Sequence, residues 1–136
     1  REKDYIFDIN KFSNVVGKTG PYVLYTYLRI HKILKNENRV HNLSNMVYNE
    51  EDRNLRLKLI ELDRAVMTAF QERKPHYIVD YIYQLALLTN TFYQNNHILG
   101  LDDETKKEDW LYILNLTSKI LKEMLNLVMI EIPENM

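Results

Sequence analysis

Two tyrosines and an arginine near the start of the chain have types and spacing that suit contact with a nucleic acid. They are Tyr22, Tyr25 and Arg29, and intervals of three and four residues place side chains on one stripe of a helix. A different stripe of the same helix is apolar and is predicted to face a core: Val23, Tyr27, Ile30 and Leu34. The outward stripe would offer two phenol rings and a guanidinium, which suit stacking on unpaired bases and binding of phosphate.

The residues before this stripe predict where its helix begins. Pro21 suits a first helical turn, because its φ is preset and the N–H that it lacks would have no partner there. Gly17 and Gly20 are expected to free the preceding backbone for a tight approach. The predicted helix extends from about residue 21 to residue 36.

Positive charge is concentrated around the same segment. The whole chain has a formal net charge of −1, but residues 11–41 hold six basic residues and one acidic residue, a local balance of +5. A basic face on an acidic body can bind a polyanion, while the acidic body limits indiscriminate binding.

The composition of the chain favours a small helical domain. A length of 136 residues suits one domain with a sizeable core, and three glycines and three prolines leave few turns for a sandwich or barrel. The absence of cysteine excludes disulfides and thiolate metal sites. No apolar run is long enough for a membrane span, and no signal peptide is visible. The first residue is Arg rather than Met, which is expected of a piece of a longer protein.

Hydrophobic spacing predicts further helices after the first. A polar connection over residues 39–49 is expected to be held down by Leu43, Met46 and Val47. Asn49, which precedes three acidic residues, predicts a helix cap with an acidic first turn. The helix that follows repeats apolar residues at helical spacing: Leu55, Leu59, Leu62, Val66 and Phe70.

Two more boundaries complete the prediction. Asp63 is expected to divide the preceding stretch by capping a second helix, and Pro75 predicts the start of the next one, which continues to about Asn95. A polar loop leads to a last helix that ends near residue 128. Its predicted inward positions are Trp110, Ile113, Leu114, Thr117, Leu121, Met124 and Val128. The predicted fold is all-α, a single bundle of about five helices.

The chain is predicted to hold one domain preceded by a short connecting segment. Residues 1–16 are expected to form an N-terminal connecting segment packed on the bundle, with a short helix from about Asp8 to near Gly17, and residues 17–136 form the helical domain. The apolar side chains expected to dock the connecting segment are Phe7, Ile9, Phe12 and Val16.

The candidate residues also have purely structural interpretations. Tyr22 and Tyr25 suit half-buried packing as well as stacking on bases. Asn90 has no advantage in a helix interior, and it either reads a base edge or lies in solvent. Most aromatic residues of the helix after Pro75 are expected to be core: Tyr77, Tyr81, Tyr83, Phe92 and Tyr93.

Nothing in the sequence predicts catalysis within these residues. The four histidines have no metal-ligand spacing, and no serine or threonine lies in a nucleophile motif. A glycine-rich loop that could hold phosphate is also missing from the sequence.

Several blocks of the sequence resemble the C-terminal region of arginyl-tRNA synthetases. They are DYIFD at residues 4–8, GKTGPYVLYTYLRI at 17–30, PH at 75–76 with YIYQLA at 81–86 and NTFY at 90–93, and IEIPENM at 130–136. In that family a helical anticodon-binding domain of the DALR type begins with such a TGPY segment. The resemblance spans nearly the whole chain in consistent order.

The resemblance implies a class I synthetase that uses ATP, with magnesium as its counter-ion, to join arginine to its tRNA in the cytoplasm. The residues that match tRNA-contacting positions at the anticodon are Tyr22, Tyr25, Arg29, Asn90 and Met136. No catalytic residue, metal site or cofactor is expected in this chain, because the active site would lie in an upstream catalytic domain of the same protein. The expected partners are the anticodon loop of an arginine-accepting tRNA and that domain, in a monomer with no membrane contact.

Three positions depart from the pattern of the family. Leu24 and Tyr27 stand where Gln and His are common, and Met129 stands where Gly is usual before the tail. Gly would accept a left-handed helix end more easily than Met. An alternative hypothesis is a helical protein-interaction module that keeps this fold, in which the outward stripe is an apolar patch for a protein partner.

Overall fold

The computed structural model describes residues 8–13, 17–35, 42–44 and 46–133, and these residues form helices joined by loops, with no strand among them. The elements are α1 (Ile9–Phe12), α2 (Gly20–Lys35), α3 (Glu50–Ile60), α4 (Leu62–Glu72), α5 (His76–Asn95), the 3₁₀ turn η1 (Ile98–Gly100) and α6 (Glu104–Leu127). Helices α2 to α6 confirm the predicted bundle of about five helices. None of the described helices is long and apolar enough to cross a membrane.

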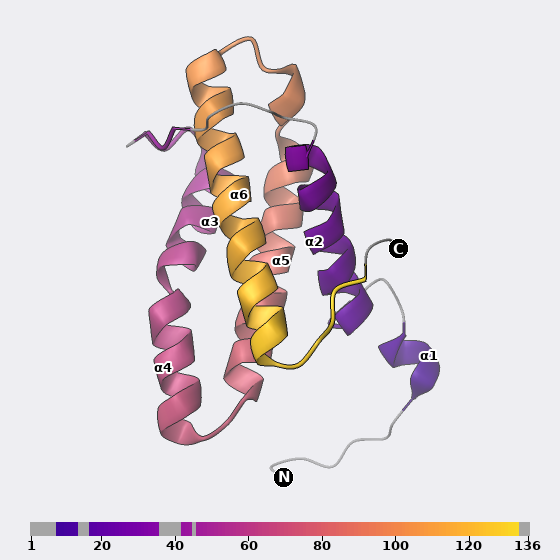
Figure 1. Ribbon diagram of the computed structural model, residues 1–136. Helices are drawn as coiled ribbons and strands as arrows, with labels where there is room; N and C mark the ends of the chain where they lie inside the picture. Colours follow the sequence, from indigo (N-terminus) through magenta and orange to yellow (C-terminus); the bar gives the residue numbers. More distant parts are fainter. Residues whose placement is uncertain (1–7, 14–16, 36–41, 45, 134–136) are drawn as a thin grey trace.

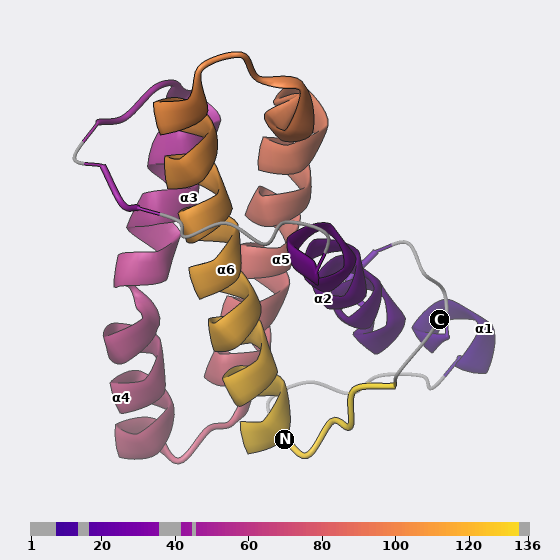
Figure 2. The ribbon, with the colours of Figure 1, turned by 45° about the horizontal axis from the view of Figure 1, so that its top comes forward.

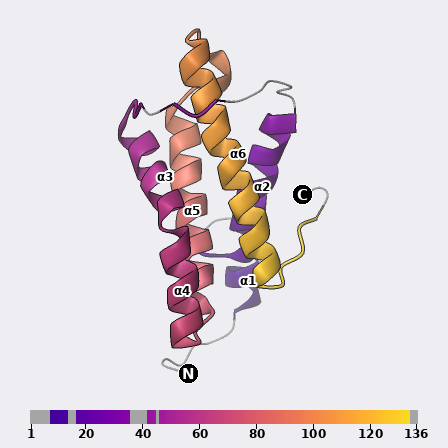
Figure 3. The same ribbon diagram turned by 60° about the vertical axis from the view of Figure 1, so that its left-hand side comes forward.

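The antiparallel helices α5 and α6 form the middle of the bundle, as Figure 1 shows. Helices α3 and α4 follow one another along one side of this pair, and α2 lies on the other side (Figures 1 and 3). With the top of the bundle turned toward the viewer, α2 crosses the pair obliquely instead of running parallel to it (Figure 2). One surface of α2 therefore faces α5 and α6, and the opposite surface is uncovered by the described helices.

The core is densest where α5 and α6 meet. Trp110 and Phe92 are fully buried and pack edge to face with ring centroids 5.2 Å apart, and Tyr48 adds a second edge contact to Trp110 at 5.8 Å. Five of the predicted inward positions on α6 are buried, and Met124 and Val128 are partly buried against the core.

Two residues predicted to face the core lie at the surface. The Phe70 side chain on α4 is 79% exposed, because α4 meets the core through Ala69 and the partly buried Leu62 and Ala65. Ile9 on α1 is also exposed, so its predicted docking role is wrong. The other predicted docking positions of residues 1–16 lie outside the described residues or have side chains that are not described.

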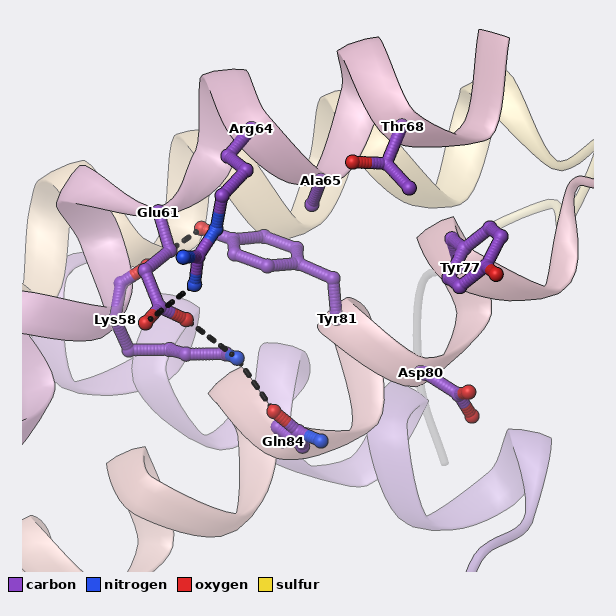
Figure 4. Close-up of a pocket in the computed structure, with 9 residues that line it drawn as sticks. All are labelled: Lys58, Glu61, Arg64, Ala65, Thr68, Tyr77, Asp80, Tyr81 and Gln84. Carbon is purple, nitrogen blue, oxygen red and sulfur yellow. Dashed lines mark hydrogen bonds and ion pairs between the residues drawn. The ribbon is translucent and has the colours of Figure 1, made fainter. Parts of the chain in front are cut away.

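The break between α3 and α4 occurs at Glu61 and not at Asp63 as predicted. Glu61 makes no side-chain cap, and its backbone is only slightly displaced from helical values, with φ −72° and ψ −5°. The Tyr81 hydroxyl of α5 donates a hydrogen bond to the Lys58 carbonyl beside the break (3.2 Å). Figure 4 shows the Lys58 ammonium held between Glu61 and Gln84. The hydrogen bond from Lys58 lowers the pKa of the Glu61 carboxyl, and burial raises the pKa of Tyr81.

The connection before α3 is held by polar contacts and by the Tyr48 ring, and not by the apolar residues predicted to hold it. Leu43, Met46 and Val47, which were expected to hold it down, are all exposed. The backbone N–H of Ser44 donates to Asp109 on α6 (2.7 Å), and that of Tyr48 donates to Asp52 on α3 (3.0 Å). Buried carboxylates thus fix the path of this segment.

A single guanidinium joins these carboxylates. Arg56 donates from Nε to Asp52 (2.7 Å) and from Nη2 to Asp109, and both aspartates have no exposed surface. Its Nη1 donates to the Ser44 carbonyl (3.3 Å). Burial alone would lower the pKa of Arg56, but the hydrogen bonds and charges of the two aspartates raise it. The network connects α3, α6 and the segment before α3. The predicted Asn49 cap is confirmed, since its side chain accepts from the Asp52 N–H (2.9 Å).

The end of α6 contains a left-handed residue at the position where the family pattern has Gly. Met129 has φ 60° and its side chain is 89% exposed. The Ile130 N–H donates to the Leu125 carbonyl (2.9 Å) and the Met129 N–H donates to that of Asn126 (3.0 Å), which is the Schellman pattern. Met thus adopts the backbone conformation that Gly accepts more easily, and the helix end is preserved.

The Arg56 network should contribute strongly to stability. We expect Arg56→Ala to lower the free energy of unfolding by about 3–5 kcal/mol, because it leaves two buried carboxylates without a counter-charge. The matched control is Arg64→Ala, which removes an exposed arginine paired with Glu61 and should change stability by less than about 1 kcal/mol. Urea unfolding of both variants measures the difference, and equal losses would contradict this role.

Candidate nucleic-acid interface

The start of α2 is fixed by a side-chain cap. Thr19 Oγ1 accepts a hydrogen bond from the Tyr22 N–H (3.3 Å), and Pro21 lies in the first turn. Gly17 has φ +97°, a conformation that favours glycine, so its predicted backbone freedom is used. The tight approach predicted there is wrong, because an added Cβ would meet nothing within 4 Å. Gly20 does not need to be glycine, because its φ is ordinary and an added Cβ would meet nothing within 4 Å.

One face of α2 is buried against α5 and α6. It includes three of the four predicted residues, whereas Leu34 is only partly buried. Thr26 and Ile33, which were not predicted, complete the buried face: Val23, Thr26, Tyr27, Ile30 and Ile33. A rotation of about 100° per residue places Tyr25 on the opposite side of the helix from the middle of this face.

Tyr25 is the exposed member of the predicted stripe. Its side chain is 46% exposed, and no hydrogen bond, ion pair or ring contact joins it to a described residue. A phenol ring in this position is free to stack on a planar partner.

Tyr22 and Arg29 lie at the edge of α2 that faces α5. The Tyr22 ring is half-buried and lies 5.8 Å from the Tyr83 ring, at an interplanar angle of 52°. The Arg29 guanidinium lies 4.4 Å from the centre of the Tyr93 ring, which is a cation–π arrangement. Both side chains thus have structural contacts in addition to their partly exposed surface.

Asn90 reaches this edge from inside the bundle. It is 9% exposed, so the alternative that it lies in solvent is wrong. Its Nδ2 donates to Thr26 Oγ1 (2.7 Å), and that hydroxyl donates to the Tyr22 carbonyl (2.9 Å). A chain of two hydrogen bonds therefore joins α5 to the backbone of α2 at Tyr22.

The charge around the exposed face of α2 is positive. Lys18, Arg29, Lys32 and Lys35 lie in the segment 17–35, which contains no carboxylate. Lys18 is the one of these four with an ion pair to a described residue, Asp80 on α5. The exposed face therefore combines an aromatic ring with two lysines, Lys32 and Lys35, that make no ion pair with a described residue. Aromatic rings beside cations suit single-stranded nucleic acid.

The other sequence predictions have mixed outcomes. Met136 lies outside the described residues. Tyr81 and Phe92 are core as predicted, but three other aromatic residues of α5 are only half-buried: Tyr77, Tyr83 and Tyr93. Sequence reasoning missed the pairing of Tyr83 and Tyr93 with the stripe, because it requires the crossing geometry of α2 and α5. No group of three His, Asp or Glu side chains among the described residues could hold a metal ion.

Comparison with known sequences gives a consistent result. A sequence model of the DALR anticodon binding domain matches residues 23–136. An arginine–tRNA ligase of Alkaliphilus oremlandii is 37% identical, as is one of Agathobacter rectalis, each over 98% of this chain. The match covers 24% of each of these proteins, so the chain spans about a quarter of the length of these relatives.

Solved structures show the same similarity. The arginyl-tRNA synthetase of Thermus thermophilus superposes with a TM-score of 0.82 at 29% identity, over 90% of this chain and 22% of that one. That of Plasmodium falciparum superposes with a TM-score of 0.84 at 26% identity, over 100% of this chain and 24% of that one.

Stability measurements should separate the two tyrosines of the stripe. We expect Tyr22→Ala to lower the free energy of unfolding by about 1–2 kcal/mol, because it removes a half-buried ring that packs on Tyr83. Tyr25→Ala should change it by less than about 0.5 kcal/mol, because the ring is exposed and has no partner among the described residues. Thermal unfolding followed by circular dichroism compares them. A large loss of stability for Tyr25→Ala would show that this ring is part of the core.

Proposed function

Because this chain belongs to the DALR anticodon binding domain family, we propose that it is the part of an arginine–tRNA ligase that binds the anticodon loop of the tRNA. The observation that carries the proposal is the exposed Tyr25 ring on a helix face that has no carboxylate and whose Lys32 and Lys35 make no ion pair with a described residue. Anticodon bases are unpaired and have accessible faces, so an aromatic ring can stack on them. The lysines beside the ring supply the attraction for the phosphates.

The five sequence-predicted residues have different parts in this proposal. Tyr25 stacks on a base, and Arg29 donates to a phosphate or a base edge from its position on the Tyr93 ring. Tyr22 contributes its partly exposed edge. Asn90 acts from the interior through Thr26, which keeps α2 in register on α5. Met136 is assigned to the anticodon by its resemblance to the family alone.

The activity of the whole protein is part of the same proposal. The ligase would join arginine to tRNA in the cytoplasm as a monomer, with ATP and its magnesium counter-ion bound by a catalytic domain beyond the residues of this chain. The described residues do not fit a metal site, and we assign none of the chemical steps to them. Their part is to hold the tRNA while the reaction takes place elsewhere in the protein.

The alternative function, a protein-interaction module, requires a different kind of contact at α2. A protein partner would use the ring of Tyr25 as part of an apolar patch, and the binding would depend weakly on salt. Binding of RNA through phosphate contacts weakens steeply as salt rises. The two functions therefore differ in a property that a titration measures.

We expect the chain to bind the anticodon stem-loop of an arginine-accepting tRNA through Tyr25. Tyr25→Ala should weaken binding by about 1–3 kcal/mol, because it removes a stacked base. Affinity in the wild type should fall with salt as expected for roughly two to four phosphate contacts. Fluorescence anisotropy with a labelled stem-loop, at several salt concentrations, measures both quantities.

The matched control is Phe70→Ala, which removes an even more exposed aromatic ring from α4. It should leave the RNA affinity unchanged, because α4 lies across the bundle from α2 (Figure 1). Equal weakening by Phe70→Ala and Tyr25→Ala, or an affinity that does not respond to salt, would contradict the proposed function.

A further inference from the structure

A groove with a basic lining lies between α2 and α6, on the edge of α2 away from α5. Its cavity volume is about 360 Å³. Two helices distant in sequence form it side by side (Figure 1). The lining residues are Tyr27, His31, Leu34, Lys35, Asn115, Ser118, Lys119 and Lys122.

Three lysines around this groove have no counter-charge among the described residues. Lys35 comes from α2, and Lys119 and Lys122 come from α6. None of the three makes an ion pair with a carboxylate of the described residues, and no Asp or Glu in that part of the chain lines the groove. The positive charge balance of residues 11–41 predicted a basic region on α2, but it did not indicate that residues of α6 extend this region.

The three lysines give the groove an excess of positive charge. All three are exposed; Lys119 and Lys122 are three residues apart on α6, and Lys35 comes from α2. Glu123 lies four residues after Lys119, but it does not line the groove and makes no ion pair with these lysines. This excess of positive charge attracts an anion.

The groove is also built to hold a ligand in place. Its wall on the α2 side is the buried Tyr27 ring with the His31 ring stacked on it, with centroids 5.8 Å apart and an interplanar angle of 13°. Asn115 and Ser118 add an amide and a hydroxyl from α6. These groups can donate hydrogen bonds to phosphate oxygens between the flexible lysines.

The groove and the predicted stripe lie on neighbouring parts of the same side of α2. At about 100° per residue, the arc from Arg29 through Tyr25, Lys32 and Lys35 to His31 covers roughly 160°. Leu24 and Leu28 lie within this arc and are partly buried against the core. Arg29 marks the edge at α5, where it lies on Tyr93. His31 and Lys35 mark the edge at α6. An RNA strand that crosses α2 from the α5 edge would contact the Tyr25 ring first and the basic groove next.

We propose that the groove between α2 and α6 binds the phosphodiester backbone of the same RNA whose bases contact Tyr25. This inference rests on the proposed function and adds a second contact site to it. Lys119 and Lys122 contact phosphates from α6, Lys35 contacts them from α2, and Asn115 with Ser118 orients them. The site recognises backbone charge and shape and carries no base specificity.

The test removes the two α6 lysines, because they lie outside the helix that carries the stacking ring. The variant is Lys119→Gln with Lys122→Gln, and the control is Arg53→Gln with Arg64→Gln, which changes the net charge equally on α3 and α4. Anisotropy with the anticodon stem-loop measures affinity against salt for both variants and the wild type. Circular dichroism verifies that each variant is folded.

We expect the α6 variant to bind the stem-loop about tenfold more weakly at 0.1 M salt. The slope of its log affinity against log salt concentration should be shallower than that of the wild type by roughly one to two. The control variant should keep the affinity and slope of the wild type. If the α6 variant binds as the wild type does, or both variants weaken equally, the groove is not a contact site, although the proposed function stands. If the wild type itself binds no stem-loop, the proposed function fails, and this inference fails with it.

Discussion

The geometry of the candidate interface depends on how α2 is docked on α5 and α6. The same helix must bury one face and present the opposite face with its ring and cations. Apolar contacts alone allow a helix to slide or rotate between similar packings. The buried hydrogen bonds from Asn90 to Thr26 and from Thr26 to the Tyr22 carbonyl are directional, and they favour one rotation of α2. A rotation of one residue, about 100°, would bring Tyr25 toward the core.

The charged residues on the two sides of the bundle have different roles. On the side of α3, the Arg56 guanidinium binds two buried aspartates and the Ser44 carbonyl. The charge of Arg56 is therefore neutralised within the fold. On the side of α2, most cations have no partner among the described residues, and the groove at α6 contains three of them. The first arrangement stabilises the fold, whereas the second leaves charge available for a polyanion.

The sequence predicted features that depend on neighbours along one helix. The stripe at Tyr25, the cap at Asn49 and the start of α5 after Pro75 all follow from local spacing and backbone chemistry. It did not predict features that depend on how helices cross. The sequence did not distinguish a base contact from solvent exposure for the Asn90 side chain, because its partner, Thr26, lies on another helix. Phe70 lies at the same helical spacing as neighbouring residues that face the core, so the sequence predicted that it would be buried. Only the packing of α4 on α5 shows that this position is uncovered.

The central claim is that RNA lies across the exposed face of α2, and amide chemical-shift mapping by NMR tests it most directly. The protein would be labelled with ¹⁵N and titrated with the unlabelled anticodon stem-loop. The account predicts that the largest shifts fall on α2 around Tyr25 and Lys32 and on α6 around Lys119 and Lys122, with little change on α4. Shifts concentrated around Phe70 on α4, with α2 unchanged, would contradict it.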